Sequence, residues 1–218
     1  MLKDFIRLVY PEYCAGCEVL LQLTERGVCS NCFIDLKTYN NKDAYSSFGR
    51  YEVKQELYAY EFEKNGLFQK IIHQIKYNHN KIAAHVLGIE LGKEIKRKET
   101  ALDVDVIIPV PISDKKRKKR GFNQCEYIAN GVKQVINKPI KKNVLFRKNN
   151  LRTQIMSNRY ERWENISNQY YVKQSIDPNM TVLLIDDIVT SGATVQSCIE
   201  AFKQESLNFV VAALGGRK

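Results

Sequence analysis

The stretch that decides the fold runs from Val182 to Thr194 and reads Val-Leu-Leu-Ile-Asp-Asp-Ile-Val-Thr-Ser-Gly-Ala-Thr. Its apolar beginning predicts a buried strand over 181–185, and the apolar spacing after Thr194 predicts a helix. A strand, a loop of small residues and a helix in this order are typical of parallel α/β sheets, which bind ligands beyond the carboxyl ends of their strands. The segment therefore predicts both a fold class and the place of a site.

The loop that follows this strand has the composition of a phosphate site. It places hydroxyl groups and backbone amides near the start of a helix, where the amides lack partners and the helix dipole favours an anion. Gly192 permits a close approach or a positive φ, and no lysine follows, so a Walker A motif is excluded. The candidate phosphate-binding residues are Val189, Thr190, Ser191, Gly192, Ala193 and Thr194.

Asp186 and Asp187 are adjacent carboxylates at the end of the predicted strand. They repel each other and lose solvation there, so they need hydrogen-bond donors or a cation. The vicinal hydroxyls of a ribose would supply two donors, and Mg²⁺, which keeps several waters, would neutralise charge. A simple loop-capping role is the alternative, but the whole segment favours a ribose site.

The rest of the chain alternates helical and strand patterns. Apolar residues recur at helical spacing from Asn65 onward, over 81–97 and over 122–136. Strand patterns occupy 57–62, 104–110, 144–146 and 208–214. Such alternation predicts a parallel sheet flanked by helices. We divide the chain into a cysteine module over 1–38, an aromatic, strand-rich hood or connector over 39–63 and an α/β domain over 64–218.

Two further segments suggest a second anion site. The strand over 104–110 ends in Pro109-Val110-Pro111, where an anion could use only the amides of Val110 and of residues 112–114 because proline has no N–H. A simple strand-ending turn is the alternative. The run from Lys115 to Arg120 carries six positive charges that repel one another. We expect a flexible loop, either solvated or ordered by a diphosphate or a nucleic-acid backbone.

Four of the six cysteines form two Cys-x₂-Cys pairs, which are Cys14 with Cys17 and Cys29 with Cys32. Four thiolates would complete the tetrahedral coordination of a structural Zn²⁺, and a disulfide or redox role is the alternative. Metal binding would give this short segment folding energy that its small core cannot supply. The two remaining cysteines fall on apolar helix faces, which predicts buried packing.

The net charge of +10, from 34 basic and 24 acidic residues, fits either solvated lysines or a polyanionic partner. No segment is apolar enough to span a bilayer, and the first ten residues lack a signal-peptide pattern. We therefore expect a cytoplasmic protein, and reduced thiols in that compartment favour metal binding over disulfides.

These motifs resemble two known groups. The acids and the loop of 182–194 are similar to the phosphoribosyltransferase signature, which implies the type I phosphoribosyltransferase fold, with Asp186 and Asp187 on ribose and 189–194 on its 5-phosphate. Nearly the whole chain resembles the ComF family of competence-associated, phosphoribosyltransferase-like proteins. The motifs that carry this second resemblance are Pro109-Val110-Pro111, Arg117, Arg120-Gly121-Phe122-Asn123-Gln124, Leu145, Arg147, Gln154, Arg159 and Asn165. The long basic run and Cys125 depart from the family pattern.

The ComF resemblance implies 5-phosphoribosyl diphosphate and Mg²⁺ as ligands, and single-stranded DNA and DNA-uptake helicase machinery as partners. It implies Arg120 as a catalytic residue beside Asp186 and Asp187. The residues expected on the diphosphate side are Lys76, Val110, Pro111, Arg117, Asn123, Gln154 and Arg159. Lys76 also fits a solvent-exposed lysine at a helix end, where it favours the dipole.

Three functions are consistent with this sequence. The first is a phosphoribosyl transferase, in which arginines and Mg²⁺ stabilise the departing diphosphate. The second is a competence factor that binds single-stranded DNA without turnover, because basic and aromatic residues suit backbone attraction and base stacking. The third is a regulator that senses the phosphoribosyl ligand. It ranks last because the sequence has no helix-turn-helix signature.

Overall fold

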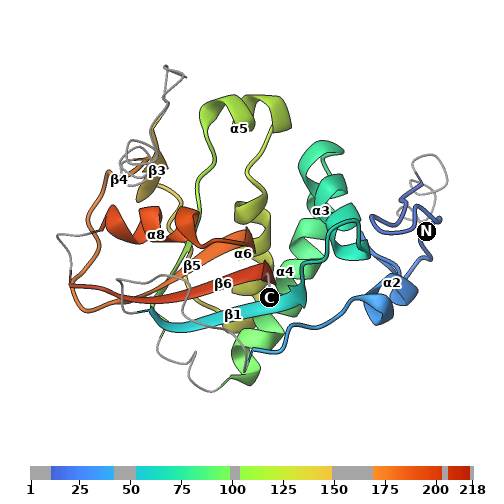
Figure 1. Cartoon of the computed structure of the whole chain (residues 1–218), viewed down its shortest axis with the longest axis horizontal. Coiled ribbons are helices and arrows are strands. Elements are labelled where there is room, and N and C mark those ends of the chain that lie inside the picture. The colour runs from blue at the N-terminus through green and yellow to red at the C-terminus, as the bar shows by residue number, and fades with distance from the viewer. Residues whose placement is uncertain (1–10, 42–52, 99–103, 149–168, 203–205, 217–218) are drawn as a thin grey trace.

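A parallel sheet of four strands lies at the centre of the computed structural model, which describes residues 11–41, 53–98, 104–148, 169–202 and 206–216. The strand order is β1-β6-β5-β2, and the arrowheads of β1, β5 and β6 point the same way, toward α3 (Figure 1). The strands are β1 (Val53–Glu61), β2 (Val106–Pro109), β5 (Thr181–Val189) and β6 (Asn208–Gly216). The predicted α/β fold class is confirmed.

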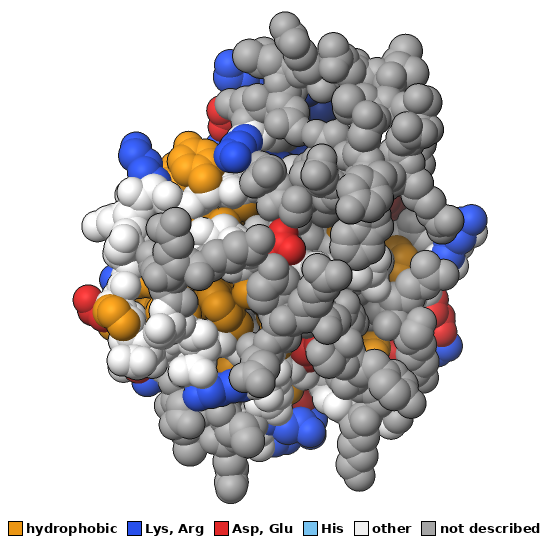
Figure 2. All heavy atoms as spheres, turned by 60° about the vertical axis from the view of Figure 1, so that its left-hand side comes forward, with side chains coloured by type: hydrophobic (Ala, Val, Ile, Leu, Met, Phe, Trp, Pro, Cys, Tyr) orange, Lys and Arg blue, Asp and Glu red, His pale blue; other side chains and the backbone are white. Residues whose placement is uncertain are grey.

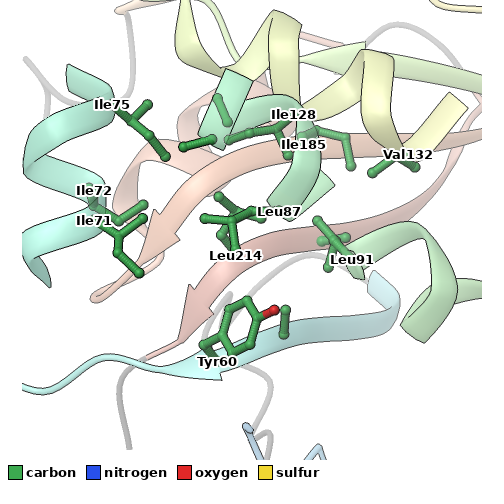
Figure 3. Packing of buried hydrophobic residues seen from close by; sticks show 14 of the residues in the cluster. Tyr60, Ile71, Ile72, Ile75, Leu87, Leu91, Ile128, Val132, Ile185 and Leu214 are labelled. Carbon is green, nitrogen blue, oxygen red and sulfur yellow. The ribbon is translucent and has the colours of Figure 1, made fainter. Parts of the chain in front are cut away.

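Helices cover both faces of this sheet. The helices α3 (Leu67–Tyr77), α4 (Lys81–Arg97) and α6 (Gln124–Ile136) pack on one face, and α8 (Ala193–Glu200) packs on the other. Side chains alternate along β5: Leu183 and Ile185 join the first core, and Val182 and Leu184 join the second. Figure 3 shows the first core, where side chains from α3, α4 and α6 meet those from the strands. A strand buried on both faces explains the continuous apolar run of 182–185.

The helices α4 and α6 touch through glycines. A Cβ atom on Gly131 would lie 2.2 Å from the His85 carbonyl oxygen, and one on Gly88 would lie 2.3 Å from the Ile128 carbonyl oxygen. The two backbones can approach this closely only because neither residue has a side chain. This contact fixes α6, whose first turn packs near the acidic end of β5.

Three short elements, α5, β3 and β4, lie outside the central sheet and its main helices, and one of them corrects an expectation. The basic run predicted as a flexible loop is instead a helix, α5 (Asp114–Arg120). Its ends carry strong signals that outweigh charge repulsion, because Ser113 accepts a hydrogen bond from the Lys116 amide at 3.3 Å and Gly121 ends the helix at φ 71°. The strands β3 (Leu145–Arg147) and β4 (Tyr170–Val172) form a separate antiparallel pair.

The N-terminal part packs onto the same core as the helices. Its short helix α2 (Ser30–Asp35) and Leu21, Val28 and Leu36 belong to the cluster built on α3 and α4. The strand expected over 57–62 begins at Val53 and pairs with β6 in the central sheet. The boundaries proposed at 38 and 63 stay a prediction. In the described ranges, no helix is long and apolar enough to cross a membrane.

Candidate functional site

The two carboxylates lie in the last part of β5, which continues through them to Val189 rather than ending before them. Asp186 is 7% exposed and Asp187 is 6% exposed. The Asp187 amide donates to Asp186 Oδ1 at 2.8 Å, and the Ile188 amide donates to Asp187 Oδ1 at 2.9 Å. The strand's own backbone therefore satisfies one oxygen of each acid and leaves their remaining oxygens to other groups.

Lys76 is the principal partner of Asp187. Its Nζ atom lies 2.6 Å from Asp187 Oδ2, and its side chain is only 20% exposed, so it is not the solvated helix-end lysine of the alternative reading. Burial alone would lower the pKa of Lys76, but the charge of Asp187 and its hydrogen bond outweigh burial and raise that pKa. Gln124, in the first turn of α6, donates from Nε2 to the same oxygen at 3.2 Å. Asp187 is thus held by a cation and an amide.

Asp186 has no cation in direct contact among the described residues. Burial, together with the charge of Asp187, raises its pKa to about 7. The Cys125 thiol lies 3.5 Å from Asp186 Oδ1 and can donate to it. Cys125 is fully buried, as expected for a packing residue, yet it also contacts an acid of the site. A group that supplies a charge or a donor to Asp186 would therefore be bound favourably.

Arg120 reaches the acids only through another residue. Its Nη1 atom donates to Gln124 Oε1 at 2.9 Å, and its guanidinium lies 5.5 Å from the centre of the Tyr77 ring. Gln124 therefore links Arg120 to Asp187. The sequence reasoning placed Gln124 within the Arg-Gly-Phe-Asn-Gln motif but gave it no role. The signal that could have identified it is its membership of that motif, at the first position of α6.

Three predicted diphosphate residues have other partners. Asn123 caps α6 by accepting from the Cys125 amide at 3.1 Å, and it donates to the Val110 carbonyl at 3.0 Å. The Val110 amide donates to the Ile185 carbonyl at 2.9 Å, which corrects the expectation that it is free for an anion. Arg117 pairs with Glu126 at 3.1 Å. Gln154 and Arg159 lie outside the described residues.

The loop that the sequence predicts to bind phosphate lies between β5 and α8. Thr190, Ser191 and Thr194 are exposed, and Gly192 stands at the start of α8 with φ 72° and no side-chain capping hydrogen bond. The left-handed conformation explains the glycine. A helix start without a side-chain cap leaves the first amides of α8 in need of acceptors, which is the property of an anion site.

Cations of two helices lie near the acids. Lys76 of α3 contacts Asp187, and Arg120 of α5 is linked to Asp187 through Gln124. Burial lowers the pKa of Lys116 on α5, and the positive charges of Arg147, Arg120 and Lys76 lower it further. Arg147 was part of the family resemblance but was not predicted as a site residue. Two acids bordered by these cations suit a ligand that carries both hydroxyls and phosphates.

The four N-terminal cysteines form a second site. The Sγ atoms of Cys14, Cys17, Cys29 and Cys32 all lie within 4.8 Å of one another. Four sulfurs at ~2.3 Å from a tetrahedral zinc ion are about 3.8 Å apart, so a small contraction would seat the ion. Burial would raise the pKa of Cys14, but amide donors that include Cys29 and Gly16 outweigh it and lower that pKa to about 7. The donor set therefore fits zinc.

Known proteins with similar sequences or structures were found by comparison. No family model matches the chain. A segment of 127 residues is 26% identical to amidophosphoribosyltransferase of Escherichia coli, covering 58% of this chain and 23% of that protein. Among solved structures, the likeness to the purine-biosynthesis regulatory enzyme covers 61% of this chain and 26% of the other, with a TM-score of 0.41. The parallel sheet with paired acids at the end of β5 defines a phosphoribosyltransferase-like α/β protein.

Within that class the chain is ComF-like. It is 23% identical over 199 residues to Competence protein F of Haemophilus influenzae, covering 84% of this chain and 86% of that protein. It is also 27% identical over 128 residues to DNA utilization protein YhgH of Escherichia coli O157:H7, covering 57% of this chain and 56% of the other.

Proposed function

We propose that this chain binds 5-phosphoribosyl diphosphate together with Mg²⁺ at the carboxyl end of β5. The observation that carries the proposal is the pair of buried acids, Asp186 and Asp187, followed within a few residues by a helix start that has no side-chain cap. Buried carboxylates favour ribose hydroxyls as donors, and uncapped amides favour a phosphate as acceptor. One phosphorylated ribose carries both hydroxyls and a phosphate, so a single ligand could satisfy the acids and the amides together.

Lys76 and Arg120 suit the diphosphate end of this ligand. Lys76 neutralises Asp187 at 2.6 Å. Ribose hydroxyls that donate to Asp187 would take over part of this role and release the ammonium group toward the diphosphate. Mg²⁺, when bound, would screen the diphosphate charge through oxygen ligands and retained waters. In a transfer reaction these cations would stabilise the diphosphate as it leaves the anomeric carbon.

Calorimetric titration tests the binding proposal. Asp187→Asn removes one charge and one strong acceptor, so we expect affinity for 5-phosphoribosyl diphosphate in Mg²⁺ to fall at least about tenfold. Asp177→Asn is the matched control because Asp177 is exposed and lies at the other end of the strand, before β5 begins. Equal affinity in all three proteins would refute the site. Release of diphosphate with a panel of bases, amines and oligonucleotides would then separate transfer from binding alone.

A second candidate function is binding of single-stranded DNA in competence. It is favoured by α5, whose Lys115, Lys118 and Lys119 are exposed, and by the names of the relatives that the chain resembles. On the face shown in Figure 2, Lys and Arg side chains lie at several separate places around the edge, with acidic side chains between them. The concentration of charge on α5 therefore makes that helix the part to test.

Neutralising the exposed lysines of α5 tests this second candidate. The triple variant Lys115→Gln, Lys118→Gln and Lys119→Gln should weaken oligonucleotide binding and reduce the slope of its salt dependence, because fewer counterions are released. Lys133→Gln, on the exposed side of α6, is the control. Unchanged affinity and slope in the triple variant would remove α5 from any role in DNA binding.

We further propose that Zn²⁺ occupies the four-cysteine site and has a structural role.

A further inference from the structure

A pocket of about 360 Å³ lies away from the acid pair, between the N-terminal part and the central domain. It is lined by Phe33 of α2, Thr38, Ala59 and Tyr60 of β1, and Glu90 and Glu94 of α4. The two glutamates are four residues apart, so they project from one face of the helix one turn apart. The volume falls within the range of about 300–1,000 Å³ that small-molecule sites occupy.

Tyr60 gives this pocket a polar group that nothing else uses. The residue is only 6% exposed, and its hydroxyl makes no hydrogen bond to any residue in the described ranges. Figure 3 shows its ring beside the sheet, with the hydroxyl oxygen on the side of α4. Burial, followed by the charges of Glu90 and Glu94, raises the pKa of Tyr60, so the hydroxyl stays neutral. The hydroxyl oxygen can therefore accept a hydrogen bond from a ligand in the pocket.

The charge of the pocket is opposite to that of the chain. The protein has a net charge of +10, yet the ionisable residues that line the pocket are all acids: Glu90, Glu94 and Tyr60. Glu90 pairs with Lys93 at 2.8 Å and Glu94 pairs with Arg97, but both cations are mostly exposed. Surface ion pairs of this kind are weak, so a cation inside the pocket can compete with them.

We propose that this pocket binds a small organic cation through a primary ammonium or guanidinium group. The N–H groups would donate to Glu90 and Glu94 and to the Tyr60 oxygen, while the Phe33 ring provides an apolar wall that also attracts a cation. The aromatic lining favours an organic cation over a hydrated metal ion. The site is separate from the proposed phosphoribosyl site, because it uses residues of α2, β1 and α4 and none of the acids of β5.

Calorimetric titration with agmatine and putrescine at low salt tests this proposal. The variant Glu90→Gln with Glu94→Gln should weaken binding at least about tenfold, and Tyr60→Phe should weaken it about threefold or more without loss of folded protein. Lys93→Gln with Arg97→Gln should strengthen binding about threefold, because the competing cations are removed. The two double variants lie on the same helix but should change the affinity in opposite directions. General destabilisation of the helix would not produce this result.

Further arms identify the source of the cation and separate this proposal from the first one. Asp187→Asn should leave agmatine affinity unchanged even if it abolishes phosphoribosyl binding. If a peptide with one exposed lysine binds more tightly than free amines, the cationic group belongs to a partner protein. If free amines bind more tightly, it belongs to a metabolite. Equal affinity of the wild type and the Glu90→Gln, Glu94→Gln variant for every probe, or no binding of any probe, would overturn the proposal.

Discussion

The end of β5 and the cysteine module both gather groups that are negative when ionised, but they stabilise them in different ways. At β5, Asp187 has an internal cation, Lys76, and an amide donor, Gln124. In the module, four thiols stand within 4.8 Å of one another, and in the described part of the chain no basic side chain pairs with them. A side-chain cation therefore neutralises one acid of the first site, whereas the four thiols of the second could be neutralised by a metal ion.

This difference assigns different roles to the two regions. In the acid pair only Asp187 is paired with a side-chain cation, which a ligand could replace, so the pair suits a binding site. Four clustered thiolates without a cation repel one another, so the metal that neutralises them also supplies folding free energy. We therefore expect metal removal to affect the module most and side-chain changes to affect the β5 site most.

Removal of zinc should have the largest effect. Structural zinc contributes roughly 10–16 kcal/mol to the folding of zinc-finger peptides, far more than one side chain contributes. We expect about one zinc per purified chain. Chelation or Cys29→Ser should unfold residues 11–41, seen as rapid hydrogen exchange there, while β5 and β6 stay protected. Stable protection of 11–41 in metal-free protein would contradict the structural role of the site.

Loss of Lys76 should have the next largest effect. Lys76→Met leaves Asp187 buried without its cation, so we expect the free energy of unfolding to fall by roughly 2–4 kcal/mol in denaturant titrations. Adding Asp187→Asn should restore part of that loss, because the unpaired charge is removed. Lys93→Met, in an exposed pair, is the control, with a change below about 1 kcal/mol. Losses that simply add in the double variant would show that the ion pair contributes nothing.

The pH dependence of stability tests Asp186. Its pKa is raised from 3.8 to about 7 in the folded protein, so between these values the folded chain binds more protons than the unfolded chain. Stability therefore falls as pH rises through this window. Between pH 5 and pH 8 the wild type should lose roughly 2 kcal/mol relative to Asp186→Asn. Stability curves that run parallel over this range would show that Asp186 has an ordinary pKa.

The surface pair of Arg117 and Glu126 should have the smallest effect. The side chain of Arg117 is 55% exposed, and Lys142 also lies 3.7 Å from Glu126. Arg117→Gln should change the free energy of unfolding by less than about 1 kcal/mol, and added salt should abolish even that difference. A loss as large as that of Lys76→Met would mean that surface and buried pairs do not differ as we infer.

The sequence predicted the features that local patterns determine. The helix expected over 81–97 is α4 (Lys81–Arg97), because a regular apolar stripe and the Asn80 cap define it. The acids and the loop of 186–194 were predicted from a single contiguous segment, and the predicted strand is part of β5, which also contains the acids. The cysteine cluster followed from the spacing of the two pairs, and the four sulfurs do lie together.

Contacts between distant segments could not be predicted in this way. Gln124 meets Asp187 across 63 positions of sequence, and no local pattern shows that the end of α3 brings Lys76 to the same carboxylate. The strand β4 has only three residues, which is too short for a periodic signal. The segment predicted as a loop forms the helix α5, because the cap at Ser113 and the glycine at 121 outweigh the charge repulsion.

The most direct test of the central claim is a backbone amide titration followed by nuclear magnetic resonance, with ribose 5-phosphate and Mg²⁺ as the probe. If the paired acids hold the diol and α8 holds the phosphate, the largest shift changes will occur at Asp187 and at the amides of 192–194, and they will be lost in Asp187→Asn. Shift changes confined to α5, with 187 and 192–194 unmoved at saturation, would contradict the account.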